Sequence, residues 1–265
     1  MTPLQNINSV YFKREDLNPT GSAKDRALQV QLKKLLRLGY KNAVISSTGN
    51  AAISATHFCH QEGINLTVFV SPKIDPQKLK LINASVIHSP KAISDAIKFS
   101  REYNAYLLRQ STDPAALLGY QEIGTEILKQ LPLVTSVFIP TGSGTTLLGI
   151  AQTLPKNVKI FAAQSAYNPT LASAFNLDYQ PEKINLTDAL TVKYLPLKQK
   201  LIKTLQQHSS YPIIVSNQEI MAAQKIIDSL PVSTESALAL AAYLQSKHDP
   251  SVGQYPVIIC TSTKR

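Results

Sequence analysis

The stretch Lys13–Arg26 reads KREDLNPTGSAKDR and follows the apolar run Val10–Phe12. The Asn-Pro and Thr-Gly-Ser segments inside it are typical of turns. Beyond it, apolar residues recur with the period of an α-helix at Leu28, Leu32, Leu35 and Leu36. The pattern predicts a strand, a turn and a helix in succession, with Lys24 in or near the first turn of that helix.

Lys24 occupies an unusual place for a cation, because the N-terminus of a helix already carries partial positive charge. Such a position favours the neutral amine, which is the form that reacts with a carbonyl group. A solvated lysine on a basic helix also accounts for this residue taken alone. The residue by itself therefore leaves both interpretations open.

Two further stretches each join an apolar run to a small polar loop. Ala43–Ile45 is followed by SSTGNAA at Ser46–Ala52, and Val137–Ile139 is followed by PTGSGTT at Pro140–Thr146. Glycines in the second loop let backbone amides approach an anion, the hydroxyls add donors, and the helix that follows points its positive end there. An ordinary helix cap fits the first loop, and a plain strand-to-helix turn fits the second.

The three stretches, in this order and at this spacing, resemble the fold-type II pyridoxal-phosphate enzymes. That group holds threonine synthase, serine and threonine dehydratases, cysteine synthase and the tryptophan synthase β chain. The lysine loop and the SSTGN loop look most like threonine synthase, and the resemblance runs from Thr2 to Thr261. It implies two open α/β domains, as in the tryptophan synthase β chain, with the active site in the cleft between them. The large cofactor-binding domain would cover 1–41 plus 131–265, and a smaller inserted domain 42–130.

The resemblance also implies which residues hold the cofactor, pyridoxal 5'-phosphate. Lys24 is the catalytic residue: it would form the Schiff base and, once freed by the substrate amine, remove the Cα proton. Asn50 would bond the ring hydroxyl, and Thr261 would face the pyridine nitrogen, with Ser262 as the alternative if the register slips by one. The phosphate would lie in the loop made of Gly142, Ser143, Gly144, Thr145 and Thr146. The substrate carboxylate would be held by Ser47, Thr48, Gly49 and Asn50.

The activity that the resemblance implies is elimination or replacement on an amino acid, as in the conversion of O-phosphohomoserine to threonine and phosphate. A neutral hydroxyl at Thr261, unlike an aspartate, does not hold the pyridine nitrogen protonated and so favours elimination and replacement. At the positions where the family binds the substrate phosphate, this sequence has Ala51 and Ala116. Lys13 and Lys193 are candidates for that role only because they are positively charged. A serine/threonine dehydratase or other replacement enzyme, and a cofactor-binding homologue without turnover, are the alternatives.

Composition argues against several other classes of protein. The 265 residues carry a formal net charge of +10, but the basic residues are dispersed and no aromatic-interleaved basic patch occurs, so no nucleic-acid partner is expected. No apolar run reaches membrane-span length, no secretory signal opens the sequence, and two cysteines make no disulfide framework. His57 and His60 lack the further ligands of a metal site. We expect a cytoplasmic enzyme of amino-acid biosynthesis, a homodimer, with a small amino-acid substrate and no metal.

Along the chain, residues 2–12 predict one short entry strand, and strands then alternate with helices, which favours a parallel α/β sheet. A helix is expected to begin at Gly119. Prolines divide residues 166–212 into short pieces, so we make no prediction of a helix or strand for this region. Val257–Cys260 predicts a final buried strand that ends just before Thr261.

Overall fold

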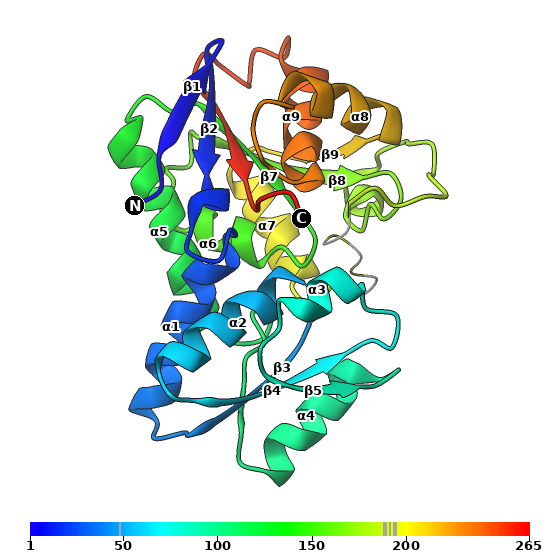
Figure 1. Ribbon diagram of the computed structural model, residues 1–265. Coiled ribbons are helices and arrows are strands. Elements are labelled where there is room, and N and C mark those ends of the chain that lie inside the picture. The colour runs from blue at the N-terminus through cyan, green and yellow to red at the C-terminus, as the bar shows by residue number, and fades with distance from the viewer. Residues whose placement is uncertain (48, 188–189, 191, 193–194) are drawn as a thin grey trace. The chain divides into compact units, whose positions relative to one another are not determined.

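The computed structural model describes residues 1–47, 49–187, 190, 192 and 195–265 (Figure 1). The chain forms two compact units: Met1–Gly21 together with Tyr120–Arg265, and Ser22–Gly119. Each unit contains its own sheet with helices against it. The expected α/β class is therefore confirmed.

The larger unit is built on a six-stranded sheet. Its strands are parallel except for β1 at one edge. The spatial order is β1 (Leu4–Ile7), β2 (Val10–Arg14), β10 (Pro256–Cys260), β7 (Ser136–Pro140), β8 (Lys159–Ser165) and β9 (Pro212–Val215). Because β10 lies between β2 and β7, chain segments from both ends of the sequence are neighbours in the interior of this sheet.

The single entry strand expected over residues 2–12 is wrong, because that segment is a hairpin. β1 and β2 pair antiparallel, and the turn between them is Asn8-Ser9 with φ of 51° and 65°. A two-residue turn with both φ values positive matches the right-handed twist of the strands that it connects. The break at this turn lets β2 pair with β10 on its other side.

Helices cover this sheet and enclose the main core. They are α5 (Ala115–Gln130, which continues from the smaller unit), α6 (Thr145–Ala151), α7 (Lys198–Gln207), α8 (Asn217–Ile226) and α9 (Thr234–Ser246), with 3₁₀ turns η1 (Glu15–Leu17) and η2 (Ala172–Phe175). α9 packs on β7, β8, β9 and β10, and its neighbour α8 lies beside it in Figure 1. Phe138 and Phe161 stack in this core with ring centroids 4.7 Å apart.

The smaller unit has a four-stranded parallel sheet in the order β5 (Ser85–His88), β4 (Asn65–Val70), β3 (Asn42–Ser46) and β6 (Tyr106–Leu107). Its helices are α1 (Lys24–Arg37), α2 (Asn50–Gln61), α3 (Pro76–Lys80) and α4 (Ala92–Glu102). α1 packs on α2, so the lysine helix belongs to this unit, whereas the expected large domain included 1–41. The functional division into 1–41 plus 131–265 and 42–130 stays a prediction.

Both cysteines, Cys59 and Cys260, are buried free thiols. Burial raises the pKa of each thiol to about 12, so both stay protonated and unreactive near neutral pH. Within the described residues, no helix combines the length and apolar composition that a membrane crossing requires.

His208, just after α7, is a fully buried imidazole with a defined tautomer. Its Nδ1 donates to the carbonyl oxygen of Val158 at 2.8 Å, so Nε2 is left to accept from Nζ of Lys156 at 3.2 Å. Burial lowers the pKa of His208, and the Lys156 charge lowers it further. A second proton on Nε2 would face an ammonium group.

Stability is therefore expected to fall as the pH drops below 6.5, the ordinary pKa of histidine. The unfolded chain takes up the proton at a pH where the folded protein still excludes it, so acid favours unfolding, and this contribution is absent above that pH. Urea unfolding between about pH 8 and about pH 5 measures the effect. His208→Asn, which keeps an N–H donor but cannot titrate, should show a shallower dependence. Equal slopes for both proteins would contradict this account.

Candidate active site

Lys24 is the first residue of α1 and is half-buried. The turn before it depends on Gly21, whose φ of 73° is in the left-handed region. The Gly21 amide donates to the carbonyl oxygen of Asn18 at 2.8 Å, and its own carbonyl accepts from the Thr263 amide at 2.9 Å. The segment near the end of the chain thus supports the lysine loop, a contact with no signal in the local sequence.

A buried ionic network holds the start of the lysine loop. The Lys13 ammonium lies 2.5 Å from the Glu126 carboxylate and 2.7 Å from the Thr2 carbonyl oxygen. The Asn18 amide donates to the fully buried Glu15 carboxylate at 2.7 Å. Lys13 is fully buried and its charge is already compensated inside the protein, so the expectation that it could bind a substrate phosphate is wrong.

The second candidate loop connects β3 to α2. Asn50 is the first residue of α2 and is half-buried, and Gly49 is the residue that precedes the helix. The Gly49 amide donates to the Ser47 hydroxyl at 3.3 Å, which closes the loop. Thr48 lies outside the described residues, as does Lys193. The expected substrate-binding loop therefore lies at the start of a helix that packs against the lysine helix.

The glycine loop follows β7 and leads into α6. Gly144 has φ 78°, and a β-carbon there would overlap the side chain of Leu201 on α7. Ser143 Oγ lies 3.1 Å from Thr145 Oγ1. Gly142, Ser143 and Thr146 are half-buried, whereas Thr145 is buried. The loop therefore combines glycine backbone with half-buried hydroxyls at Ser143 and Thr146, and the Leu201 side chain lies against Gly144.

Thr261 follows β10, the parallel neighbour of β7 in the sheet. The register pairs Val257 with Val137 and Ile258 with Phe138, so Thr261 and the glycine loop emerge at the same sheet edge. Thr261 is half-buried. The neighbouring Ser262 is buried, and its hydroxyl donates to Ser233 Oγ at 3.0 Å. The geometry favours Thr261 over Ser262 as the hydroxyl that faces a bound group.

This edge fits the phosphate and ring of the expected cofactor. An anion needs amides and hydroxyls without side-chain bulk between them, and Gly142 to Thr146 offer that arrangement. Thr261 adds a neutral hydroxyl on the adjacent strand end. The larger unit thus carries Gly142–Thr146 and Thr261 together, and the smaller unit carries Lys24, Ser47, Gly49 and Asn50.

Asp113, at the start of α5, has a structural role. Its carboxylate accepts hydrogen bonds from the side chains of Gln31 at 2.9 Å, Lys34 at 2.9 Å and Tyr106 at 2.6 Å. Burial alone would raise the pKa of this carboxyl, but these hydrogen bonds outweigh it and the pKa is lowered. Ala116, one turn further on, has 0% of its surface exposed. The segment where the family resemblance places a phosphate-binding residue is therefore closely packed.

Ala116→Arg is accordingly expected to destabilise the protein. A long charged side chain has no room at a fully buried position, so overpacking and desolvation should cost about 3 kcal/mol or more. Leu118→Arg on the same helix is the matched control, because Leu118 is 54% exposed. Urea unfolding should separate the two variants clearly. Similar stability of both would show that position 116 can accommodate an arginine.

Among the described residues, no group of three or more His, Cys, Asp or Glu side chains is placed to hold a metal ion. The ring of His57 on α2 instead packs edge-on against Phe58, with centroids 4.9 Å apart.

Comparison with known proteins identifies the family. The model of the family described as "Pyridoxal-phosphate dependent enzyme" matches residues 1–262. The chain belongs to this family. Pyridoxal phosphate is therefore its cofactor, and the fold-type II assignment made from the three motifs is confirmed.

Several curated relatives match most of the chain. It is 26% identical to threonine synthase of Methanosarcina acetivorans, over 97% of this chain and 70% of that protein. It is 27% identical to L-threonine ammonia-lyase of Geobacter sulfurreducens, over 69% of this chain and 49% of that protein. It is 26% identical to mitochondrial threonine dehydratase of Schizosaccharomyces pombe, over 91% of this chain and 43% of that protein. The chain thus spans about half or less of the last two.

Solved structures of the same fold extend over the whole chain. Maize serine racemase superposes with a TM-score of 0.87 at 19% identity, covering 100% of this chain and 88% of that one. Processed threonine deaminase isoform 2 from Solanum lycopersicum gives 0.85 at 22% identity, covering 100% and 79%. At these identities the likeness concerns the fold.

Proposed function

We propose that the protein is a lyase that catalyses elimination or replacement on an amino acid, with threonine synthase-like conversion of O-phosphohomoserine to threonine and phosphate as the specific reaction. The SSTGN loop supports this reading, as does the match to a threonine synthase over 97% of the chain. A homodimer, a cytoplasmic location and a role in amino-acid biosynthesis stay predictions.

Each proposed residue has a separate task. Bound at this site, pyridoxal phosphate supplies an electron sink for the substrate. The Lys24 amine accepts the proton from the substrate Cα and later gives it back to the substrate. Asn50 orients the ring, and Ser47 and Gly49 help to hold the substrate carboxylate at the start of α2. The loop Gly142–Thr146 binds the phosphate with backbone amides and hydroxyls.

The position of Thr261 supports the proposed type of reaction. Its hydroxyl lies at the end of β10, beside the glycine loop and on the same sheet edge. A neutral hydroxyl leaves the pyridine nitrogen unprotonated, whereas a carboxylate there would hold a proton on it. The weaker electron sink favours loss or exchange of a leaving group over prolonged accumulation of negative charge at Cα.

A serine/threonine dehydratase is the second candidate, and the structure adds an observation in its favour. Ala116 is fully buried and Lys13 is paired with Glu126, so neither position supplies a cation for a substrate phosphate. A substrate without a phosphate group needs no such cation. The relatives named as an ammonia-lyase and a dehydratase agree with this candidate.

Steady-state kinetics on four amino acids distinguishes the candidates. A threonine synthase releases phosphate and forms threonine from O-phosphohomoserine. A dehydratase releases ammonia and a 2-oxoacid from serine or threonine. Turnover of O-acetylserine in the presence of a nucleophile indicates a replacement enzyme. A cofactor-loaded protein that turns over none of the four would contradict the proposal and favour a homologue without turnover.

A further inference from the structure

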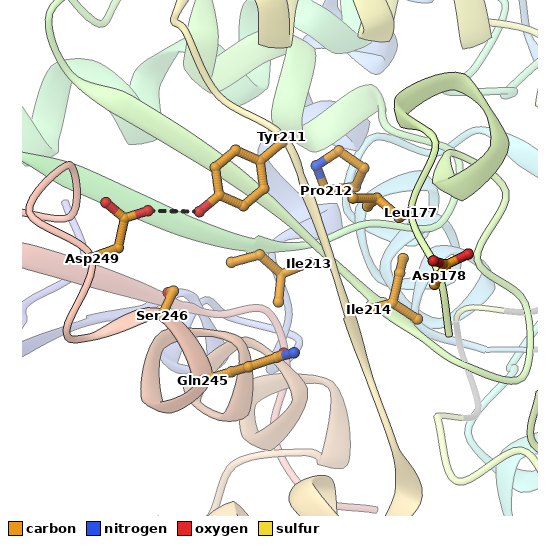
Figure 2. Close-up of a pocket in the computed structure, with 9 residues that line it drawn as sticks. All are labelled: Leu177, Asp178, Tyr211, Pro212, Ile213, Ile214, Gln245, Ser246 and Asp249. Atoms are coloured by element: carbon orange, nitrogen blue, oxygen red, sulfur yellow. Dashed lines mark hydrogen bonds between the residues drawn. The ribbon is translucent and has the colours of Figure 1, made fainter. Parts of the chain in front are cut away.

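A surface pocket of about 310 Å³ lies in the larger unit, lined by none of the residues assigned to the active site. Figure 2 shows the side chains that line it. They come from β9, from the end of α9 and the turn after it, and from the segment after η2. The lining residues are Leu177, Asp178, Tyr211, Pro212, Ile213, Ile214, Gln245, Ser246 and Asp249.

The polar groups of this pocket offer acceptors, because the hydroxyl protons are already in use. The Tyr211 hydroxyl donates to the Asp249 carboxylate at 2.8 Å, as Figure 2 shows. The Ser246 hydroxyl donates to the carbonyl oxygen of Ala242 at 2.8 Å. Both hydroxyl oxygens keep lone pairs for a ligand, and ionised carboxylates accept only. Only the Gln245 amide adds side-chain N–H donors to the lining.

Two carboxylates give the pocket its charge. In Figure 2, Asp249 and Asp178 stand at opposite ends of the row of lining side chains. The Ser251 amide and the Tyr211 hydroxyl lower the pKa of Asp249, and the charge of Lys159 acts in the same direction, so this carboxyl is ionised at neutral pH. Asp178 is exposed. Because the chain as a whole carries +10 and so repels cations at long range, a cationic ligand would have to be held by these two local carboxylates.

The part of the pocket between these two ends is apolar. Pro212 and Ile213 are buried, Leu177 is half-buried, and Figure 2 places them between the two carboxylates. Such a surface takes methylene groups rather than a polar chain. Acceptors at both ends and an apolar middle match a molecule with a cationic donor group at each end of a short hydrocarbon chain.

We propose that this pocket binds a short aliphatic diamine, with one ammonium group on Asp249 and the other on Asp178. Each ammonium brings three N–H donors to groups that can only accept. The apolar residues between them contact the methylene chain. The site is separate from the proposed catalytic residues, so the inference does not depend on the proposed reaction.

Isothermal titration of the cofactor-loaded enzyme with putrescine tests the site. We expect saturable binding with one molecule per chain, weakened about tenfold by Asp249→Asn and by Asp178→Asn, because each loses one charge-assisted contact. Asp228→Asn, at an exposed carboxylate outside the lining, should bind like the parent. Butylamine, with one ammonium group, should bind about tenfold more weakly, and the dianion succinate should not bind.

The cofactor absorbance is recorded in the same titration, because a primary amine also reacts with pyridoxal phosphate. An unchanged spectrum with binding that depends on Asp249 and Asp178 supports the proposal. Binding that is insensitive to both substitutions overturns it, whether or not the spectrum changes. Absence of saturable heat up to about 10 mM putrescine overturns it as well. Circular dichroism of the two variants checks that both substitutions leave the fold intact.

Discussion

Replacing Lys24 with alanine is expected to abolish covalent cofactor attachment and to lower turnover by about a thousandfold or more. The substitution removes the amine that we propose to hold the cofactor and to carry the substrate proton. Borohydride treatment of the parent protein, followed by peptide mass spectrometry, should find the pyridoxyl group on Lys24. The same treatment of Lys24→Ala should leave the cofactor removable by dialysis.

Lys33→Ala is the matched control, because Lys33 is an exposed residue of the same helix α1. It should keep the adduct and the activity of the parent. A pyridoxyl group found on a lysine other than Lys24 would overturn the assignment of the catalytic residue. A helix weakened by the Lys24 substitution itself would show in circular dichroism, which separates loss of chemistry from loss of fold.

Gly144→Ala is expected to weaken cofactor binding about ten- to hundredfold. Position 144 has φ 78°, and the added methyl would overlap Leu201, so the loop must move away from its present path. Strain in the left-handed region costs about 1–2 kcal/mol. Loss of even one hydrogen bond from a backbone amide to the phosphate, worth about 1.5–3 kcal/mol, accounts for the change in affinity. Cofactor titration of the apoenzyme measures it.

Two further variants separate strain from overlap. Gly39 has φ 80° but no atom within 4 Å of an added β-carbon, so Gly39→Ala should cost stability without affecting cofactor affinity. Leu201→Ala removes the side chain that the methyl meets, so the double variant with Gly144→Ala should regain part of the affinity. Unchanged affinity in Gly144→Ala would show that this loop does not hold the phosphate.

The local sequence predicted the three strand–loop–helix motifs, and the structure begins a helix at Lys24, at Asn50 and at Thr145. These features depend on turn chemistry and on apolar periodicity within about a dozen residues. The family, the fold class and the cofactor followed from the resemblance of these motifs, in their order and spacing, to a known family. The hairpin turn at Asn8-Ser9 is not predicted by the sequence, because Asn-Ser lacks the glycine of the strongest two-residue hairpin signals.

Tertiary contacts decided the rest. α7 and β9 lie in the region 166–212 that the sequence left without a firm prediction, and Leu201 on α7 is the support beneath Gly144. The charge of Lys13 does not show whether its side chain faces solvent or pairs with Glu126, because Glu126 lies more than a hundred residues away in the sequence. The burial of Ala116 and the packing of α1 on α2 are likewise decided by distant segments. The sequence by itself determined which groups the chain offers for chemistry. Only the tertiary structure decided which of them are already committed to one another, because burial and pairing depend on residues that meet only when the chain folds.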